Sequence, residues 1–254
     1  MLQKSLTKLT DFGKELEKAR VSAILLAGGS GSRMDSALPK QHLLLRGIPV
    51  VVRSALALEQ TTAVREIVAV VRPGEEALYE DYKKTYSLSK LKLTVPGGET
   101  RQESAMNGLL AADPKATHLL FHDAARCLIT PADIEAVILD ALAYRAAALA
   151  TPAKDTVKIA PRKLSELVQP ERKNVCLVQT PQVFHADLYR AAAYQAKKDG
   201  FTGTDDCSLL EHIGVPCRMT VTERSERNFK ITTKTDLLLA EALLAAEEKE
   251  AAAK

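Results

Sequence analysis

Aromatic residues, cysteines and long apolar runs are scarce in this sequence, and each shortage excludes a class of protein. Aromatic side chains make up 4% of the 254 residues and do not interleave with basic ones, which argues against an RNA-binding module. The four cysteines form no CxxC pair, which argues against a zinc or redox motif and favours reduced thiols. No run approaches the roughly 18 uninterrupted apolar residues that cross a bilayer, so we expect no membrane segment.

A strong charge of either sign is also missing. The 35 lysine and arginine residues nearly balance 32 aspartate and glutamate residues, which leaves a formal net charge of +3. A nucleic-acid surface needs a concentrated basic stripe, so we expect no nucleic-acid partner and only a local basic site. Residues 1–20 lack the continuous apolar core of a signal peptide, which predicts a short surface helix and a soluble cytoplasmic protein.

The pattern of hydrophobicity predicts an α/β fold. Short apolar runs alternate with longer amphipathic stretches, which is typical of βαβ units around a mainly parallel sheet. With no internal repeat or linker, we predict a single domain over residues 21–246, preceded by an N-terminal extension (1–20) and followed by a polar tail (247–254). The predicted strands cover residues 22–27, 65–71, 92–95, 118–122, 147–153 and about 217–221.

Several helix boundaries are marked by capping residues. Thr100 followed by Glu103 is typical of a capping box, and Thr130 with Pro131 and Asp133 predicts a helix that ends near Arg145. Further helices are predicted over 187–200 and 205–214, each ended by a glycine, and from about residue 234 onwards.

Residues 154–179 depart from the alternation of short apolar runs and amphipathic stretches. They are typical of two short strands joined by a charged excursion that contains prolines, and they are too long for a tight turn. We therefore predict an arm or a lid.

The stretch AILLAGGSGSRMDSALPKQ, residues 23–41, carries the first sign of chemistry. A strand that leads into a glycine-rich loop lets backbone amides approach an anion, and Arg33 and Lys40 would add positive charge around a polyphosphate. No GxxxxGK[ST] string occurs, and Met34 stands where a GxGxxG motif needs its last glycine. The glycines alone leave a structural role as open as a phosphate-binding one.

The later motifs make the case more specific. LAGGSGSRM followed by PKQ resembles the signature of sugar-phosphate nucleotidyltransferases. With GGETRQES (97–104), HDAAR (122–126), DT (155–156), QTPQ (179–182), TDD (204–206) and NFKIT (228–232), the chain resembles the 2-C-methyl-D-erythritol 4-phosphate cytidylyltransferase family over residues 22 to about 243.

This resemblance implies both a fold and a reaction. The fold would be a Rossmann-like three-layer nucleotidyltransferase fold with a mainly parallel sheet and an inserted β-arm for dimerisation. The reaction would transfer CMP from CTP to 2-C-methyl-D-erythritol 4-phosphate, which gives 4-diphosphocytidyl-2-C-methyl-D-erythritol and pyrophosphate in the non-mevalonate isoprenoid pathway. Because one anion attacks another, positioned cations are the main catalytic need.

The resemblance also implies roles for individual residues. The catalytic cations would be Arg33, Lys40 and Lys230, and Asp123 would hold Mg²⁺. The residues that would contact CTP are Ala27, Gly28, Gly29, Gly31, Ser32, Gly97, Ser104 and Asp123. Without the resemblance, the two lysines could be surface charges and Asp123 could cap the next turn.

The acceptor site would be shared between two subunits. By resemblance, the arm crosses to a second copy, where Thr156 and Arg172 contact the partner's acceptor, which implies a homodimer. Arg126 and Thr180, which flank the arm in the sequence, would also bind the acceptor. Without the resemblance, Arg172 would be one charge of a solvated loop.

The sequence departs from the family pattern at two positions. Ser32 stands where the family often has an arginine, and Cys127 stands where a proline usually follows HDAAR.

Three alternatives stay open at this point. Ribitol 5-phosphate cytidylyltransferases share the loop and the aspartate motif. The AGG string slightly favours that enzyme, whereas the KDTVK and TDDCSLLE strings favour the methylerythritol phosphate enzyme. A uridylyl or guanylyl transferase for hexose phosphates suits the later motifs poorly. A catalytically silent nucleotide-binding regulator would be expected to lose the catalytic cations, which are present here.

Overall fold

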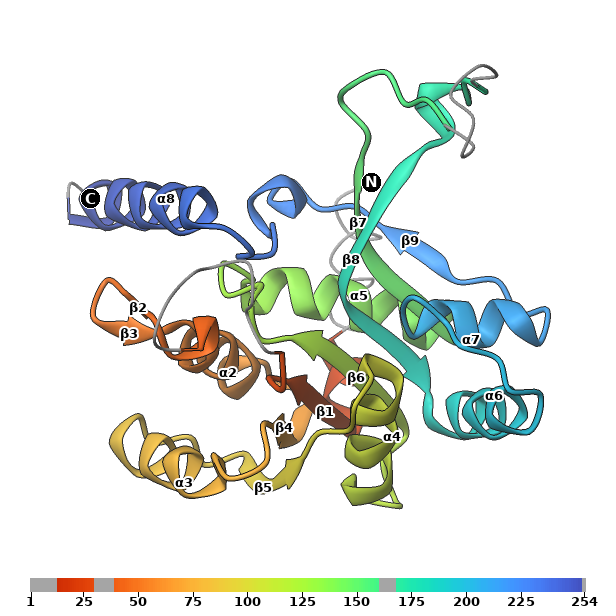
Figure 1. Ribbon diagram of the computed structural model, residues 1–254, viewed down its shortest axis with the longest axis horizontal. Coiled ribbons are helices and arrows are strands. Elements are labelled where there is room, and N and C mark those ends of the chain that lie inside the picture. Colours follow the sequence, from red (N-terminus) through yellow and green to blue (C-terminus); the bar gives the residue numbers. More distant parts are fainter. Residues whose placement is uncertain (1–12, 30–38, 160–167, 253–254) are drawn as a thin grey trace.

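Seven strands form one mixed, mainly parallel sheet in the order β5-β4-β1-β6-β8-β7-β9 (Figure 1). The computed structural model describes residues 13–29, 39–159 and 168–252. Within that part of the chain, β8 runs antiparallel to both of its neighbours and the other pairs of this sheet are parallel. The strands are β1 (Val21–Leu26), β4 (Val64–Val71), β5 (Leu91–Pro96), β6 (His118–Asp123), β7 (Ala146–Pro152), β8 (Cys176–His185) and β9 (Arg218–Thr220).

The helices lie where the sequence predicts them. The predicted capping box at Thr100 and the predicted N-cap at Thr130 are present, the latter also as a capping box with Asp133, and Arg145 caps its helix in the left-handed conformation. Residues 13–18 are helical, as expected for the N-terminal extension. The helices are α2 (Val50–Gln60), α3 (Glu76–Thr85), α4 (Arg101–Ala111), α5 (Pro131–Tyr144), α6 (Ala186–Lys198), α7 (Cys207–His212) and α8 (Lys234–Ala252), with short 3₁₀ turns η2 (Lys40–His42), η3 (Arg172–Asn174) and η4 (Ser225–Arg227).

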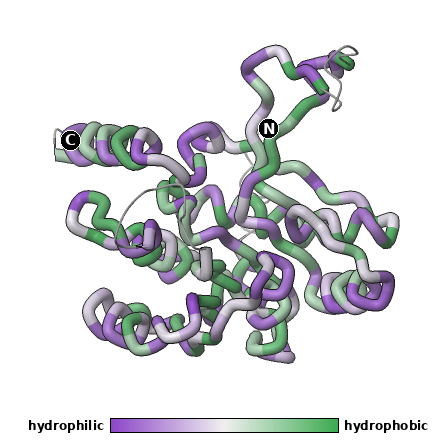
Figure 2. Tube along the Cα trace, in the orientation of Figure 1, coloured by the Kyte–Doolittle hydropathy of each residue, from purple (hydrophilic) through white to green (hydrophobic). Residues whose placement is uncertain are grey.

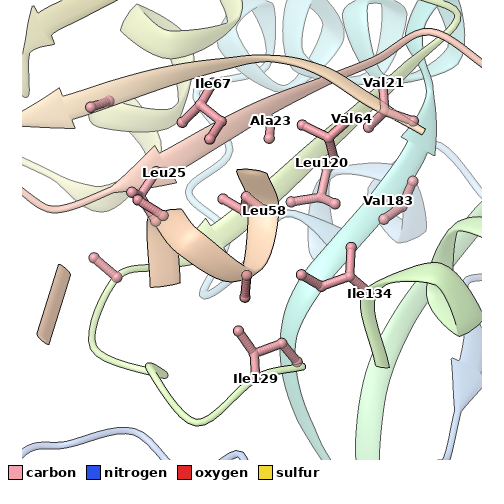
Figure 3. Packing of buried hydrophobic residues seen from close by; sticks show 14 of the residues in the cluster. Val21, Ala23, Leu25, Leu58, Val64, Ile67, Leu120, Ile129, Ile134 and Val183 are labelled. Atoms are coloured by element: carbon pink, nitrogen blue, oxygen red, sulfur yellow. The ribbon is translucent and has the colours of Figure 1, made fainter. Parts of the chain in front are cut away.

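Helices cover both faces of the sheet, which gives the three layers expected. Alternate residues of β1 point to opposite faces: Ala23 and Leu25 pack with α2, α3 and α5, whereas Ile24 packs with α4, α6 and α7. Figure 3 shows the first of these layers, with Leu58 of α2 and Ile134 of α5 against the sheet. Because such strands are buried on both sides, they form the continuous apolar runs seen in the sequence (Figure 2).

Strand β8 is the main departure from the prediction. Two short strands were expected within residues 154–179, but β8 continues to His185 and lies in the middle of the sheet. Pro181, which argues against a central strand, falls between two ladders: pairing with β6 ends at Gln182, and pairing with β7 skips from Gln182 to Val178. The missing N–H of proline therefore interrupts no pairing.

The predicted arm is formed where β7 and β8 extend beyond the other strands (Figure 1). Ile159 and Val168 pair in an isolated antiparallel bridge, and η3 lies on the return path. Residues 160–167 of the arm lie outside the described residues.

A third apolar cluster joins α8 to the body of the protein. Leu45 of a short hairpin, β2 (Leu44–Leu45) and β3 (Ile48–Pro49), packs with Cys127, Ile231 and Ala240. The hairpin turns at Arg46 and Gly47, both with positive φ, and the Arg46 guanidinium pairs with Glu248 at 2.6 Å. Among the described residues, no helix is both long and apolar enough to cross a membrane.

Candidate active site

A cleft of about 340 Å³ opens at the carboxyl ends of the parallel strands. The chain leaves β1 towards β4 on one side, and β6 lies on the other side, so this edge is a topological switch point, where α/β sheets bind ligands. The volume falls in the range of small-molecule sites. The lining residues come from five segments: 26–29 at the end of β1, Lys40 and Gln41, residues 98–101 with Ser104, residues 123–125, and Lys230.

The glycine-rich segment forms one wall of this cleft. Ala27, Gly28 and Gly29 line it, and the Ala27 amide donates to the Val70 carbonyl at 2.7 Å, which ties the start of the loop to β4. Gly31, Ser32 and Arg33, which the sequence predicts to contact the nucleotide, lie outside the described residues.

The GGETRQES segment forms the opposite wall. A side chain on Gly98 would place its Cβ 2.4 Å from Cβ of Glu103, so only glycine lets the loop pass this close to α4. Ser104 Oγ accepts from the Gly98 amide at 3.0 Å and donates to the Thr100 carbonyl at 2.9 Å. Gly97 lies behind this wall, where its amide donates to the Val71 carbonyl at 2.7 Å.

Asp123 is the carboxylate on which the positive side chains of the cleft converge. Its carboxylate lies 2.8 Å from Lys230 Nζ, 3.4 Å from Arg101 Nε and 4.0 Å from Arg126 Nε. Burial raises the pKa of this carboxyl, but the three cations outweigh burial and hold the pKa well below its usual range. Asp123 is therefore ionised and collects three cations that lie far apart in the sequence.

Arg101 is a site residue to which the sequence assigned no role. Besides Asp123, its guanidinium meets the buried Asp206 at 2.8 Å, and Asp206 also accepts from Tyr189 Oη at 2.7 Å. Burial opposes the charge of Arg101, but the two carboxylates raise its pKa above the ordinary value. The sequence did contain a signal for this pair, because Arg101 belongs to the GGETRQES motif and Asp206 to the TDD motif.

The two predicted lysines lie on one rim of the cleft although 190 positions separate them. Lys40 Nζ donates to the carbonyl of Ile231 at 3.0 Å, the residue after Lys230. The Ile231 amide in turn donates to the Ala125 carbonyl at 2.8 Å. These bonds hold the NFKIT segment across the end of β6.

A second hollow of about 640 Å³ adjoins the cleft at the base of the arm, and Lys230 lines both. Arg126 lines the second hollow, and its Nη1 donates to the Asn228 carbonyl at 3.0 Å. Thr180 is nearly buried, and its Oγ1 accepts from the Asp123 amide at 3.0 Å. The structure thus places these two predicted acceptor residues beside Asp123.

Thr156 and Arg172 are not brought to this centre. Both are exposed on the arm, and neither lines the cleft or the second hollow. Arg172 Nη1 donates to the Lys154 carbonyl at 3.0 Å.

Cys127 occupies a small apolar space behind the acceptor residues. It packs in the third cluster, and burial raises the pKa of its thiol to about 12, so it stays a neutral thiol. A cysteine in place of the family proline thus leaves the charge of this region unchanged.

The described residues include no group of three or more histidine, cysteine or acidic side chains that could enclose a metal. Among the described residues, the carboxylates that line the cleft are those of Asp123 and Glu99. Mg²⁺ is commonly bound by one or two carboxylates together with substrate phosphates and water, and this arrangement fits that pattern.

Comparison with known proteins agrees with this geometry. The protein-family model described as 2-C-methyl-D-erythritol 4-phosphate cytidylyltransferase matches residues 21–246. A protein of that name from Pelotomaculum thermopropionicum is 43% identical over 90% of this chain and 96% of its own length. The crystal structure of 4-diphosphocytidyl-2C-methyl-D-erythritol synthase from Anaerococcus prevotii is similar with a TM-score of 0.78 and 29% identity, covering 89% of this chain and 99% of that one. The 2-C-methyl-D-erythritol 4-phosphate cytidylyltransferase structure from Thermus thermophilus has a TM-score of 0.71 and 30% identity, covering 88% and 98%.

Proposed function

The chain belongs to the 2-C-methyl-D-erythritol 4-phosphate cytidylyltransferase family, and from this premise we propose how its residues divide the reaction. The protein transfers CMP from CTP to 2-C-methyl-D-erythritol 4-phosphate, in the non-mevalonate pathway. A phosphate oxygen of the acceptor forms a bond to the α-phosphorus of CTP, the bond to the β-phosphate breaks, and pyrophosphate leaves. The observation that carries the assignment of residues is the convergence of Arg101, Arg126 and Lys230 on Asp123 at the cleft.

The cleft residues bind the nucleotide and stabilise charge. The amides of Gly28 and Gly29 and the side chains of Arg33 and Lys40 bind the triphosphate, and Ala27 lines the cleft beside them with its own amide bonded to the Val70 carbonyl. The charge that develops on the α-phosphate meets Lys40 and Lys230. Gly97 and Ser104 shape the wall against which the cytosine and ribose lie, and Gly31 and Ser32 are assigned contacts with CTP. The position of Lys230 between the two hollows supports a contact with both substrates.

Asp123 is the residue that would hold Mg²⁺ together with the triphosphate oxygens. When bound, the ion neutralises phosphate charge and shapes the triphosphate for displacement. The chain itself keeps Asp123 ionised through its three cations, so the carboxylate is available at neutral pH.

The second hollow is proposed as the acceptor site, completed by a second copy of the chain. Arg126 and Thr180 belong to the same subunit as the cleft, and the partner's arm supplies Thr156 and Arg172. The arm carries exposed apolar side chains at Ile159 (56% exposed), Val168 (60%) and Leu177 (55%), which supports its burial in a homodimer.

Pyrophosphate release from CTP with Mg²⁺ tests this assignment. We expect release with 2-C-methyl-D-erythritol 4-phosphate and none with ribitol 5-phosphate, and none when UTP replaces CTP. Release with ribitol 5-phosphate alone would reassign the acceptor, and release with neither would point to a nucleotide-binding regulator.

A further inference from the structure

The side chain of His122 lies directly behind the site and has no part in the reaction as described above. It belongs to β6, one residue before Asp123, and its ring is fully buried. Its Nε2 lies 3.2 Å from the carbonyl oxygen of Arg126, and its Nδ1 lies 3.1 Å from Oγ1 of Thr180. The ring therefore contacts two residues that are proposed to bind the acceptor.

Counting donors and acceptors selects one form of this ring. The Arg126 carbonyl can only accept, so Nε2 must carry a proton. Thr180 Oγ1 already accepts from the Asp123 amide, and among the described residues its own proton has one acceptor, Nδ1 of His122. A neutral ring protonated at Nε2 satisfies all these groups. A proton on Nδ1 would leave the threonine hydroxyl without an acceptor in the described part of the chain.

The same bonds replace regular pairing where β6 and β8 separate. The ladder ends at Phe121 opposite Gln182, and continuing this register sets Asp123 opposite Thr180. There the Asp123 amide bonds to the threonine side chain, and the Thr180 carbonyl accepts from Asn228 Nδ2 at 2.9 Å.

The chain turns immediately after this point. The Arg126 amide donates to the Asp123 carbonyl at 2.9 Å, which closes the turn that carries both residues. Since His122 Nε2 bonds to the Arg126 carbonyl, the imidazole spans this turn from one end to the other.

We propose that His122 is a positioning residue for the transfer reaction. Through Nε2 it holds the turn that carries Arg126, and through Nδ1 and Thr180 it holds the backbone of Asp123. The inference rests on the proposed function, because it gives His122 a task in that same site. The same contacts engage the Thr180 hydroxyl on both sides, because it accepts from the Asp123 amide and donates to His122.

Two isosteric substitutions separate the two contacts. An asparagine amide reaches the position of Nδ1, and a glutamine amide reaches that of Nε2, so His122→Asn can keep the Thr180 contact and His122→Gln the Arg126 contact. We expect each variant to lower kcat about 10- to 100-fold with a KM for CTP within about twofold of wild type, because small displacements of reacting groups are costly. The matched control is His118→Gln, another buried histidine on β6, at the end of the strand away from the cleft.

Tautomer and kinetics together decide the outcome. In ¹⁵N NMR spectra of the whole protein, His122 should show the neutral form protonated at Nε2, and protonation at Nδ1 would overturn the proposal. It is equally overturned if both His122 variants keep the kcat of the His118→Gln control per folded molecule. A histidine that only stabilises the fold would change the amount of folded protein and leave the kcat of that folded protein the same as in the control. Those results presuppose an active wild type; a wild type that is inactive with both acceptors would instead overturn the proposed function.

Discussion

At the residue scale, the site is a balance between cations and carboxylates. Three cations, Arg101, Arg126 and Lys230, meet the carboxylate of Asp123, and Arg101 also meets Asp206. Three positive charges against two negative ones leave the centre positive, which suits a pair of phosphorylated substrates. The lysine is the cation that lines both hollows, so its removal should affect turnover most directly.

We expect Lys230→Met to lower kcat by a factor on the order of 10² to 10³, because a donor aimed at developing charge is lost. The fold should persist, since Asp123 keeps Arg101 and Arg126 as partners. Initial rates of pyrophosphate release and a thermal unfolding scan provide the measurement. Lys197→Met, at the end of α6 and away from the cleft, is the control, and equal rates in the two variants would contradict the role of Lys230.

The buried histidines predict how stability changes with pH. Burial lowers the pKa of His118 and of His122 to about 4, below the ordinary value of 6.5. Between these values the unfolded chain binds protons that the folded chain does not, so the unfolding free energy falls as the pH drops from about 6.5 towards 4. Each histidine contributes at most about 3 kcal/mol to this loss.

Urea unfolding at pH 7.5 and pH 4.5 measures this effect. We expect His118→Gln to lose less unfolding free energy between the two pH values than wild type, by about 2 kcal/mol, because one of the two histidines no longer takes up a proton on unfolding. An unchanged pH dependence in the variant would show that His118 does not titrate in this way.

At the scale of elements, close packing of helices on the sheet decides which residues are tolerated. Helix α4 crosses β1 and β4 at Gly108, where a Cβ would lie 2.4 Å from Cγ2 of Ile24 and 2.9 Å from Cγ2 of Val70. The sequence alone marks Gly108 only as a weak point of a helix, whereas the structure shows that the glycine permits the close approach.

Gly108→Ala should therefore destabilise the protein by about 1 to 2 kcal/mol, because overpacking outweighs the better helix propensity of alanine. Gly13→Ala is a matched control, since that helical glycine has nothing within 4 Å of the added Cβ and should be neutral or slightly stabilising. Urea midpoints of the two variants against wild type provide the measurement. A Gly108→Ala protein as stable as wild type would mean that α4 shifts freely on the sheet.

At the scale of the whole molecule, the arm is the feature whose proposed function requires a second copy of the chain. Its described part carries exposed apolar side chains, and Thr156 and Arg172 on it line neither the cleft nor the second hollow of their own subunit. A second copy of the chain would both cover the apolar surface and receive these two residues.

We expect Val168→Asp, which changes an exposed arm residue that lines neither hollow, to yield monomers in sedimentation velocity and to lose most acceptor-dependent turnover, because the charge would be buried at the interface. Binding of CTP should be retained, since the nucleotide cleft is formed within one chain. Tyr194→Asp, which changes another exposed apolar side chain, 71% exposed on α6, should leave both properties unchanged. A fully active monomer would rule out the shared site.

Local patterns determined much of this protein in advance. Apolar runs predicted six strands of the main sheet to within a residue or two, and the capping box at Thr100 and the N-cap at Thr130 were correct, because these signals depend on neighbours in the sequence. The motifs likewise pointed to Lys40, Asp123 and Lys230, which meet at the cleft.

What only the tertiary structure decided concerns contacts between distant segments. The central place of β8, the partnership of Arg101 with Asp206 and the link from His122 to Thr180 depend on strand order and on side chains more than 50 positions apart. Hydrophobic periodicity reports which face of an element is buried, and it carries no information about which element covers that face. The sequence therefore shows which charged residues are present, whereas only the tertiary structure shows that they converge on the carboxylate of Asp123.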